Sequence, residues 1–87
     1  MVKVYITRNL KTYTNGIFEI SLRGENIKDI IENLLEKHNG LKNFIYTNED
    51  KLSDYIKIYL NEREIRNLNN LDTKVYQDDK IILFQAI

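Results

Sequence analysis

The sequence predicts an α+β fold in which one main helix covers one face of a mixed sheet of four to five strands. Segments with strand-like alternation of apolar and polar side chains flank a single segment with helical spacing, in the order β-β-α-β-β. No proline, repeat or low-complexity tract interrupts this order. A chain of 87 residues supports one modest core, which buries roughly 60–65% of the unfolded surface. We therefore predict a single domain over residues 1–87.

The first two strands are predicted to form a hairpin with a loop longer than two residues. Residues 2–7 alternate apolar and polar side chains, as a half-buried strand does. Residues 14–16 read Thr-Asn-Gly, and Asn and Gly tolerate the positive φ of a turn. Residues 17–22 alternate again and are predicted to place three apolar side chains on one face: Phe18, Ile20 and Leu22.

The predicted helix follows. Five apolar residues occur at the i, i+3, i+4, i+7, i+8 spacing of one helical stripe: Ile27, Ile30, Ile31, Leu34 and Leu35. Asn26 is the expected N-cap, with Asp29 in the first turn and Lys37 and His38 in the last. Gly40 is expected to take the left-handed conformation just past the end of the helix.

The second half of the chain is predicted to supply the remaining strands. We expect an irregular polar segment over 41–53, a strand over 55–60, and a turn with a short extended or helical piece over 61–70. A turn over 77–79 leads to the last strand, 80–84. A right-handed crossover places this last strand beside the first.

Alternation along the strands predicts one covered and one open face of the sheet. The covered face is expected to carry Val4, Ile6, Phe18, Ile20, Ile56, Ile58, Leu60, Ile81 and Leu83. The open face is expected to carry Tyr5, Lys57, Tyr59, Ile82 and Phe84. Aromatic and aliphatic side chains gathered on an open face suggest a protein-binding surface. The alternative is that these tyrosines are ordinary strand formers.

Composition disfavours several classes of function. Thirteen basic and thirteen acidic residues give zero net charge, whereas non-specific binding to nucleic acid or membranes needs a basic excess. No secretory leader and no run of about 18 apolar residues is present. There is no cysteine, and therefore no disulfide, thiol nucleophile or thiolate metal site. We predict no nucleic-acid partner, no membrane partner and a cytoplasmic location.

An autonomous active site is also not expected. The single histidine, His38, lies at the predicted end of the helix, where a capping or solvated role is favoured. The carboxylates Glu49, Asp50, Asp54, Asp78 and Asp79 lie in loops without calcium-site spacing. Arg23, Arg63 and Arg66 are candidates to meet acidic groups on a partner. We predict no catalytic residue, no metal and no directly bound cofactor.

The last third of the chain reads YLNEREIRNLNNLDTKVYQDDKIILFQAI over residues 59–87. It resembles the C-terminal third of the MoaD/ThiS family, above all in the IRNLNNLDT segment. The resemblance implies a β-grasp, ubiquitin-like fold. Asn61-Glu62 stands where the family often has Asn-Gly, and we expect a type I turn there because that type accepts most residues. Asp78-Asp79 replaces Gly-Asp, Gln85 replaces a proline, and the Ala-Gly-Gly expected after Ile87 is absent.

The resemblance, closest to MoaD, implies the small subunit of a molybdopterin or tungstopterin synthase. In that role a ubiquitin-activating-type enzyme uses ATP to adenylate the terminal glycine. The resulting thiocarboxylate donates sulfur within a larger synthase subunit. Thiamine sulfur carriers are a poorer match because they are usually shorter and lack the inserted segment. The residues implied to contact partners are Tyr5, Tyr59, Ile82, Phe84, Gln85, Ala86 and Ile87.

Three alternatives stay open for the missing glycines. The native product continues beyond Ile87, or the chain is a relative that binds partners and has lost the chemistry, or it is a ubiquitin-like module with no role in sulfur transfer. A stiff, β-branched isoleucine is a poor substitute for a glycine at a reacting centre. The main alternative function is therefore a non-catalytic binding or regulatory subunit that docks through the open sheet face.

Overall fold

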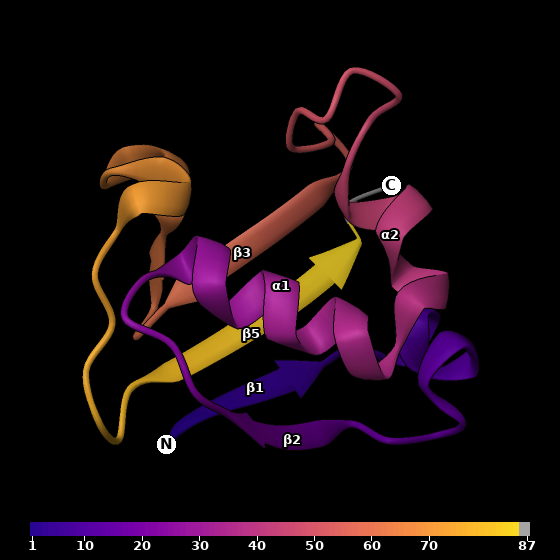
Figure 1. Ribbon diagram of the computed structural model, residues 1–87, viewed down its shortest axis with the longest axis horizontal. Coiled ribbons are helices and arrows are strands. Elements are labelled where there is room, and N and C mark those ends of the chain that lie inside the picture. The colour runs from indigo at the N-terminus through magenta and orange to yellow at the C-terminus, as the bar shows by residue number, and fades with distance from the viewer. Residues whose placement is uncertain (86–87) are drawn as a thin grey trace.

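One mixed sheet organises the computed structural model, which describes residues 1–85 except for the side chain of Arg8. The strand order is β2-β1-β5-β3-β4. The strands are β1 (Val2–Ile6), β2 (Glu19–Leu22), β3 (Ile56–Leu60), β4 (Arg63–Glu64) and β5 (Lys80–Gln85). Strand β5 lies at the centre, parallel to β1 and antiparallel to β3 (Figure 1). The predicted α+β class and the pairing of the last strand with the first are confirmed.

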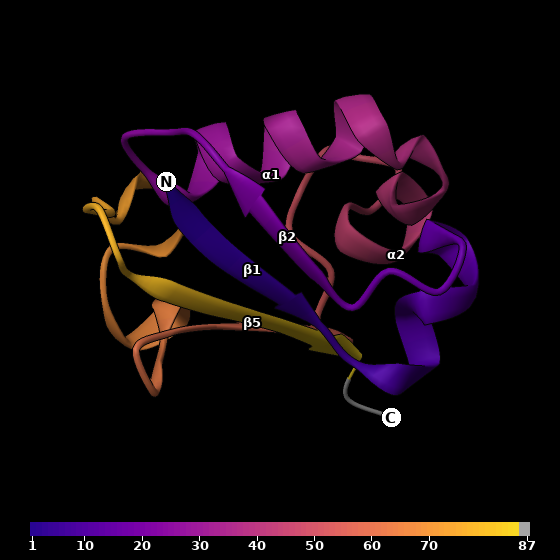
Figure 2. The same ribbon diagram turned by 90° about the horizontal axis from the view of Figure 1, so that it is seen from below.

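A single long helix, α1 (Ile27–Lys37), covers one face of this sheet (Figures 1 and 2). Asn26 caps it as predicted, because its Oδ1 accepts a hydrogen bond from the Asp29 backbone N–H at 2.8 Å. Its buried side chains are Ile27, Ile30, Ile31 and Leu34, with Leu35 partly buried. The apolar stripe predicted from the sequence therefore forms the helical side of the core, which packs against the sheet.

The predicted left-handed cap at Gly40 is wrong. His38 follows α1, and its backbone N–H bonds to the carbonyl of Leu34 at 2.9 Å. The chain then continues directly into the 3₁₀ turn η2 (Asn39–Leu41). Among the described glycines only Gly16, in the turn before β2, has a positive φ (84°). Continued helical turns take the place of a left-handed cap after α1.

The segment 41–53 is more ordered than its polar composition suggests. It contains a short helix, α2 (Lys42–Ile45), and a bridge between Tyr46 and Leu52. Leu41 and Ile45 are fully buried beside the end of α1. The spacing of Leu41, Phe44 and Ile45 is helical, but a single turn is too short a pattern to predict from sequence.

The covered face of the sheet holds the predicted core with one clear exception. Val4, Ile6, Ile56, Ile58, Leu60, Ile81 and Leu83 are buried, and Ile20 is partly buried. Phe18 was predicted to join them, yet 58% of its surface is exposed. Strand β2 begins one residue after Phe18, at Glu19, and it is the outermost strand on this side of the sheet.

Besides η2, residues 1–85 contain three further 3₁₀ helices: η1 (Arg8–Thr14), η3 (Ile65–Asn67) and η4 (Asn70–Asp72).

The turn between β3 and β4 departs from the type I turn expected from sequence. Asn61 and Glu62 both have positive φ, 48° and 77°. Positive φ at both central residues defines a type I′ turn, whose twist matches that of a hairpin and which favours glycine at the second position. Glu62 therefore holds a conformation that is unfavourable for a residue with a Cβ atom.

Glu62→Gly should therefore raise the free energy of unfolding by about 0.5–1 kcal/mol, since relief of the left-handed strain outweighs the extra flexibility of the unfolded chain. Urea denaturation followed by circular dichroism measures the change. Glu49→Gly is the matched control, because Glu49 is also exposed but its φ is not positive. A loss of stability in the Glu62→Gly variant as large as in the control would contradict the strain argument.

Candidate protein-docking surface

The open face of the sheet brings four of the predicted contact residues together. In the strand register Ile82 lies opposite Tyr5 on one side and opposite Tyr59 on the other. The Tyr59 and Phe84 rings stack with centroids 5.4 Å apart and planes 6° from parallel. We call Tyr5, Tyr59, Ile82 and Phe84 the docking face. Their predicted proximity is confirmed, while their role in binding a partner stays a prediction.

Stacking orders two of the four side chains of the docking face, Tyr59 and Phe84. Ile82 is 37% exposed, and Tyr5, Tyr59 and Phe84 are each partly exposed. Each of the three central strands contributes to the patch, so its geometry depends on the backbone ladder rather than on loops. A patch whose rings are already ordered loses less side-chain entropy on binding than one built from mobile side chains.

Charged side chains border the docking face. Lys57, opposite Phe84, reaches Glu64 at 3.4 Å, and Glu64 lies opposite Tyr59 on β4. Lys3 and Lys80 are cross-strand neighbours at the other end of the face, and both are exposed. An apolar centre with a charged rim is the usual anatomy of a protein-binding patch.

Arg66 has a role that the sequence did not reveal. Its guanidinium donates to the carbonyl oxygens of Ile56 at 2.9 Å and Ser53 at 2.7 Å. Ile56 begins β3 and lies opposite Gln85, the last residue of β5. Arg66 thus fixes the backbone beside Gln85, where β5 ends, and its suggested contact with an acidic group on a partner stays a prediction. In the sequence, only its place directly after the apolar Ile65 suggested a partly buried arginine. That pattern does not reveal which backbone carbonyls the guanidinium contacts.

Of the other predicted contacts, only Gln85 lies within the described residues. Gln85 is partly buried at the end of β5. Ala86 and Ile87 lie outside the described residues, so their predicted contacts stay predictions.

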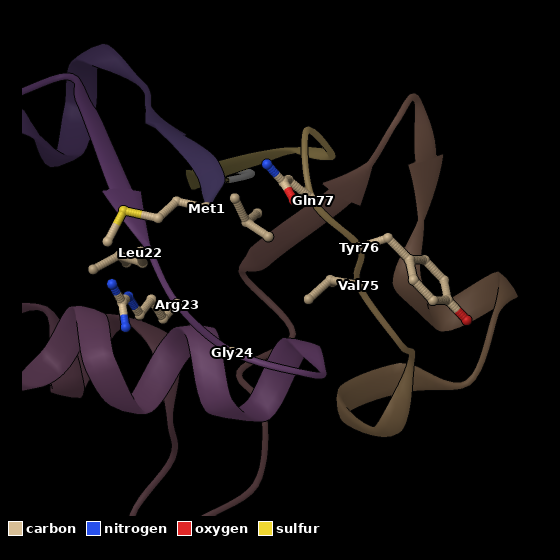
Figure 3. A pocket seen from close by; sticks show the side chains of 8 residues that line it. Met1, Leu22, Arg23, Gly24, Val75, Tyr76 and Gln77 are labelled. Carbon is tan, nitrogen blue, oxygen red and sulfur yellow. The ribbon is translucent and has the colours of Figure 1, made fainter.

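Elsewhere, the described residues show hollows but no catalytic constellation. A hollow of about 360 Å³ lies at the start of β1. Figure 3 shows Met1, Leu22 and Arg23 facing Val75 across it, while the exposed ring of Tyr76 points away. It contains no carboxylate, histidine or hydroxyl nucleophile directed at a common point. A second hollow, of about 530 Å³, lies between α1 and the segment after α2 and is bordered by Tyr46.

The surroundings of Tyr46 make its hydroxyl less acidic. Burial raises the pKa of this hydroxyl, and the nearby negative charges of Glu32 and Asp50 raise the pKa further. A raised pKa disfavours the phenolate, which is the form in which a tyrosine acts as a nucleophile. Over residues 1–85, no three His, Cys, Asp or Glu side chains gather closely enough to hold a metal ion. None of the described helices has the length and apolar character needed to cross a bilayer.

Comparison with known proteins places this chain in a family. No family model matches the chain. A chain in the crystal structure of the Amycolatopsis orientalis BexX/CysO complex superposes with a TM-score of 0.91 at 28% identity, covering 100% of this chain and 97% of that one. Small archaeal modifier protein 1 (SAMP1) from Methanosarcina acetivorans is 30% identical, with a TM-score of 0.89 and coverage of 99% and 92%. The chain belongs to the ubiquitin-like sulfur carriers and modifiers.

A curated relative supports the same family. The sulfur carrier protein CysO of Mycobacterium bovis is 24% identical over 88 residues, which is 99% of this chain and 95% of the relative. The β-grasp fold inferred from the resemblance is confirmed by the structural matches. For this ubiquitin-like carrier, the narrower assignment to molybdopterin synthesis stays a prediction, because the relatives named here are CysO and SAMP1 proteins.

Proposed function

We propose that this protein is a sulfur carrier whose C-terminal carboxylate is activated by a ubiquitin-activating-type enzyme. The observation that carries the proposal is the continuity between the docking face and the chain exit. Phe84 stacks on Tyr59 and is followed immediately by Gln85, where β5 ends. A partner that covers the docking face therefore also lies beside the residues that follow β5.

The chemistry proposed for the carrier divides the work between the two proteins. A carboxylate oxygen of a terminal glycine attacks the α-phosphate of ATP, pyrophosphate leaves, and an acyl adenylate forms. A sulfur nucleophile then attacks the acyl carbon and expels AMP, so a C–S bond replaces a C–O bond. This chain has no cysteine, so the sulfur comes from another molecule. The docking face and the anchored exit supply binding and orientation.

In its narrower form, the proposal makes this protein the small subunit of a molybdopterin or tungstopterin synthase. The IRNLNNLDT segment supports it, because this is the part of the chain with the most specific resemblance to MoaD. In the structure this segment forms η3 and η4 and includes Arg66, which secures the chain exit. The larger synthase subunit would receive the thiocarboxylate.

Adenylation of an extended chain tests the carrier proposal. We expect a chain lengthened by Ala-Gly-Gly after Ile87 to release pyrophosphate from ATP with a ubiquitin-activating-type enzyme from the same organism. Mass spectrometry should then show the acyl adenylate and, after a sulfur donor is added, replacement of one terminal oxygen by sulfur. A chain lengthened by Ala-Ala-Ala is the matched control, since side chains at the last two positions obstruct a narrow channel.

The same assay distinguishes a sulfur carrier from a non-catalytic binding module. An extended chain that binds the enzyme but forms no adenylate, while a known carrier substrate of that enzyme reacts, would contradict the carrier proposal. That result would favour the non-catalytic binding or regulatory subunit, a function that the docking face supports without any tail chemistry.

A further inference from the structure

Strand β2 leaves a short stretch of backbone unpaired at the edge of the sheet. The Ile6 N–H bonds to the Phe18 carbonyl at 2.9 Å, which sets the phase of the β1–β2 ladder. In an antiparallel pair the bonded residues alternate, so Ile20 and Leu22 also point their N–H and C=O groups toward β1. Glu19 and Ser21 must therefore direct theirs outward, and no hydrogen bond to these groups occurs within residues 1–85.

This free stretch is bounded on both sides. On one side, the Ile17 N–H donates to Thr14 O at 3.1 Å, and Ile17 O accepts from the Thr14 hydroxyl at 2.6 Å. On the other side, the Arg23 carbonyl accepts from Asn33 Nδ2 at 2.6 Å. The two residues with free groups, Glu19 and Ser21, are thus symmetric about Ile20.

That symmetry matches a twofold axis. If β2 pairs antiparallel with β2 of a second copy about Ile20, Glu19 faces Ser21 of the second copy, and Ser21 faces its Glu19. Each such pair exchanges two N–H···O=C bonds, so four backbone bonds use all the free groups. Glu19 does not face a like charge in this register, because its cross-strand neighbour is serine.

The apolar side chains of β2 fit the same register. Phe18 is 58% exposed and Ile20 is only partly buried, although alternation places both on the face that buries Leu22. In the twofold register Phe18 faces Leu22 of the second copy, and the two Ile20 side chains meet on the axis. Within the single chain, Lys11 Nζ lies over the Phe18 ring at 5.2 Å from its centroid; in the twofold register the ring also acquires an apolar neighbour.

A hollow is present where the second copy's Phe18 would lie. It has a volume of about 260 Å³, lies between β2 and α1, and includes Leu22 and Asn33 in its wall. Three charged residues also border it: Arg23, Glu36 and Lys37. Their aliphatic stems and the Leu22 side chain offer apolar surface to a ring, while their charged ends can stay in water.

We propose that β2 is a self-association edge, through which two copies of this chain form an antiparallel β2–β2 dimer with a continuous sheet. The docking face lies on the central strands and stays open in this arrangement. A contact confined to one short strand edge belongs to the class of small interfaces, so the dimer is weak and depends on concentration.

Sedimentation equilibrium of the full chain over a concentration series tests the proposal. We expect the average mass to rise from that of the monomer toward that of the dimer. Ser21→Pro should weaken association at least about tenfold, because it removes two of the four backbone bonds, one in each symmetric pair. Within the monomer this N–H has no partner, and proline is tolerated at such edges. Ser21→Ala keeps the N–H and should associate like the unmodified chain.

A side-chain variant tests the same interface without changing the backbone, in case proline disturbs the strand. Phe18→Ser should weaken association, whereas Tyr76→Ser, which also removes an exposed ring but lies far from β2, should not. Hydrogen exchange at the Glu19 and Ser21 amides should slow as concentration rises. A chain that stays monomeric up to about 1 mM would overturn the proposal and leave the edge for a strand of another protein. A dimer unaffected by both Ser21→Pro and Phe18→Ser would overturn it as well.

Discussion

Replacing Arg66 by alanine should lower the free energy of unfolding by about 2–4 kcal/mol. A hydrogen bond to a charged group contributes about 1.5–3 kcal/mol and Arg66 makes two, but its side chain is 28% exposed, so water replaces part of each bond. The change leaves the carbonyl oxygens of Ser53 and Ile56 without this donor at the start of β3. It also removes the cation that lies 3.8 Å from Glu64. Urea denaturation followed by circular dichroism measures the loss.

Two variants show whether the loss comes from these bonds. Arg63→Ala removes an exposed arginine side chain from β4, for which no side-chain hydrogen bond or ion pair occurs among the described residues. This change keeps the backbone pairing with Leu60 and should alter stability little. Arg66→Lys keeps the charge but lacks the fork that reaches two carbonyls, and should fall between the parent and Arg66→Ala. A loss in Arg66→Ala no larger than in Arg63→Ala would show that the two carbonyls find other partners.

Replacing Phe84 by alanine should weaken binding to the activating enzyme by about 2 kcal/mol, or roughly 30-fold in Kd. Phe84 is the docking-face residue nearest the chain exit, and its ring holds the Tyr59 ring in place through stacking. Removing it takes away an apolar anchor and also frees its neighbour. Isothermal titration calorimetry with the extended chain and its enzyme measures the effect.

The fold itself should survive this change. Loss of the stacked pair costs the domain about 0.5–1.5 kcal/mol beyond the lost burial. Tyr76→Ala is the control, since Tyr76 is exposed but lies away from the docking face. An unchanged affinity for the Phe84→Ala chain would remove the docking face from the proposed interaction and leave only the tail.

Sequence patterns predicted the central strands well because one face of those strands must be buried, which fixes the direction of every side chain along them. Tyr5, Ile82 and Tyr59 could be placed side by side because alternation and parallel pairing with β1 leave one register that buries Val4 and Ile81. The cap at Asn26 was predictable for a similar reason, since the helical stripe begins immediately after it.

Predictions were wrong or incomplete where the local sequence does not decide the conformation or the contacts of a residue. Phe18 continues the alternation of β2, but an edge strand has no neighbour to cover its end. At Glu62 the twist of the hairpin, not the residue type, determines a positive φ. Arg66 bonds to backbone carbonyls that lie 10 and 13 positions earlier in the chain, a distance over which side-chain patterns carry no information.

The central place of β5 also affects when this protein can fold during its synthesis. Strands β1 and β3 each pair with β5 and not with each other, so the sheet has no continuous interior until residues 80–85 are available. A ribosome that has made only the first 79 residues carries the β1–β2 hairpin, the helix α1 and the β3–β4 pair, with nothing to join the two halves of the sheet. Since closing β1 against β5 joins opposite ends of the described chain, folding should wait for late translation. A shortened product lacking β5 should therefore stay unfolded and open to proteolysis, so the strand that leads to the proposed reactive end is also the one that completes the domain.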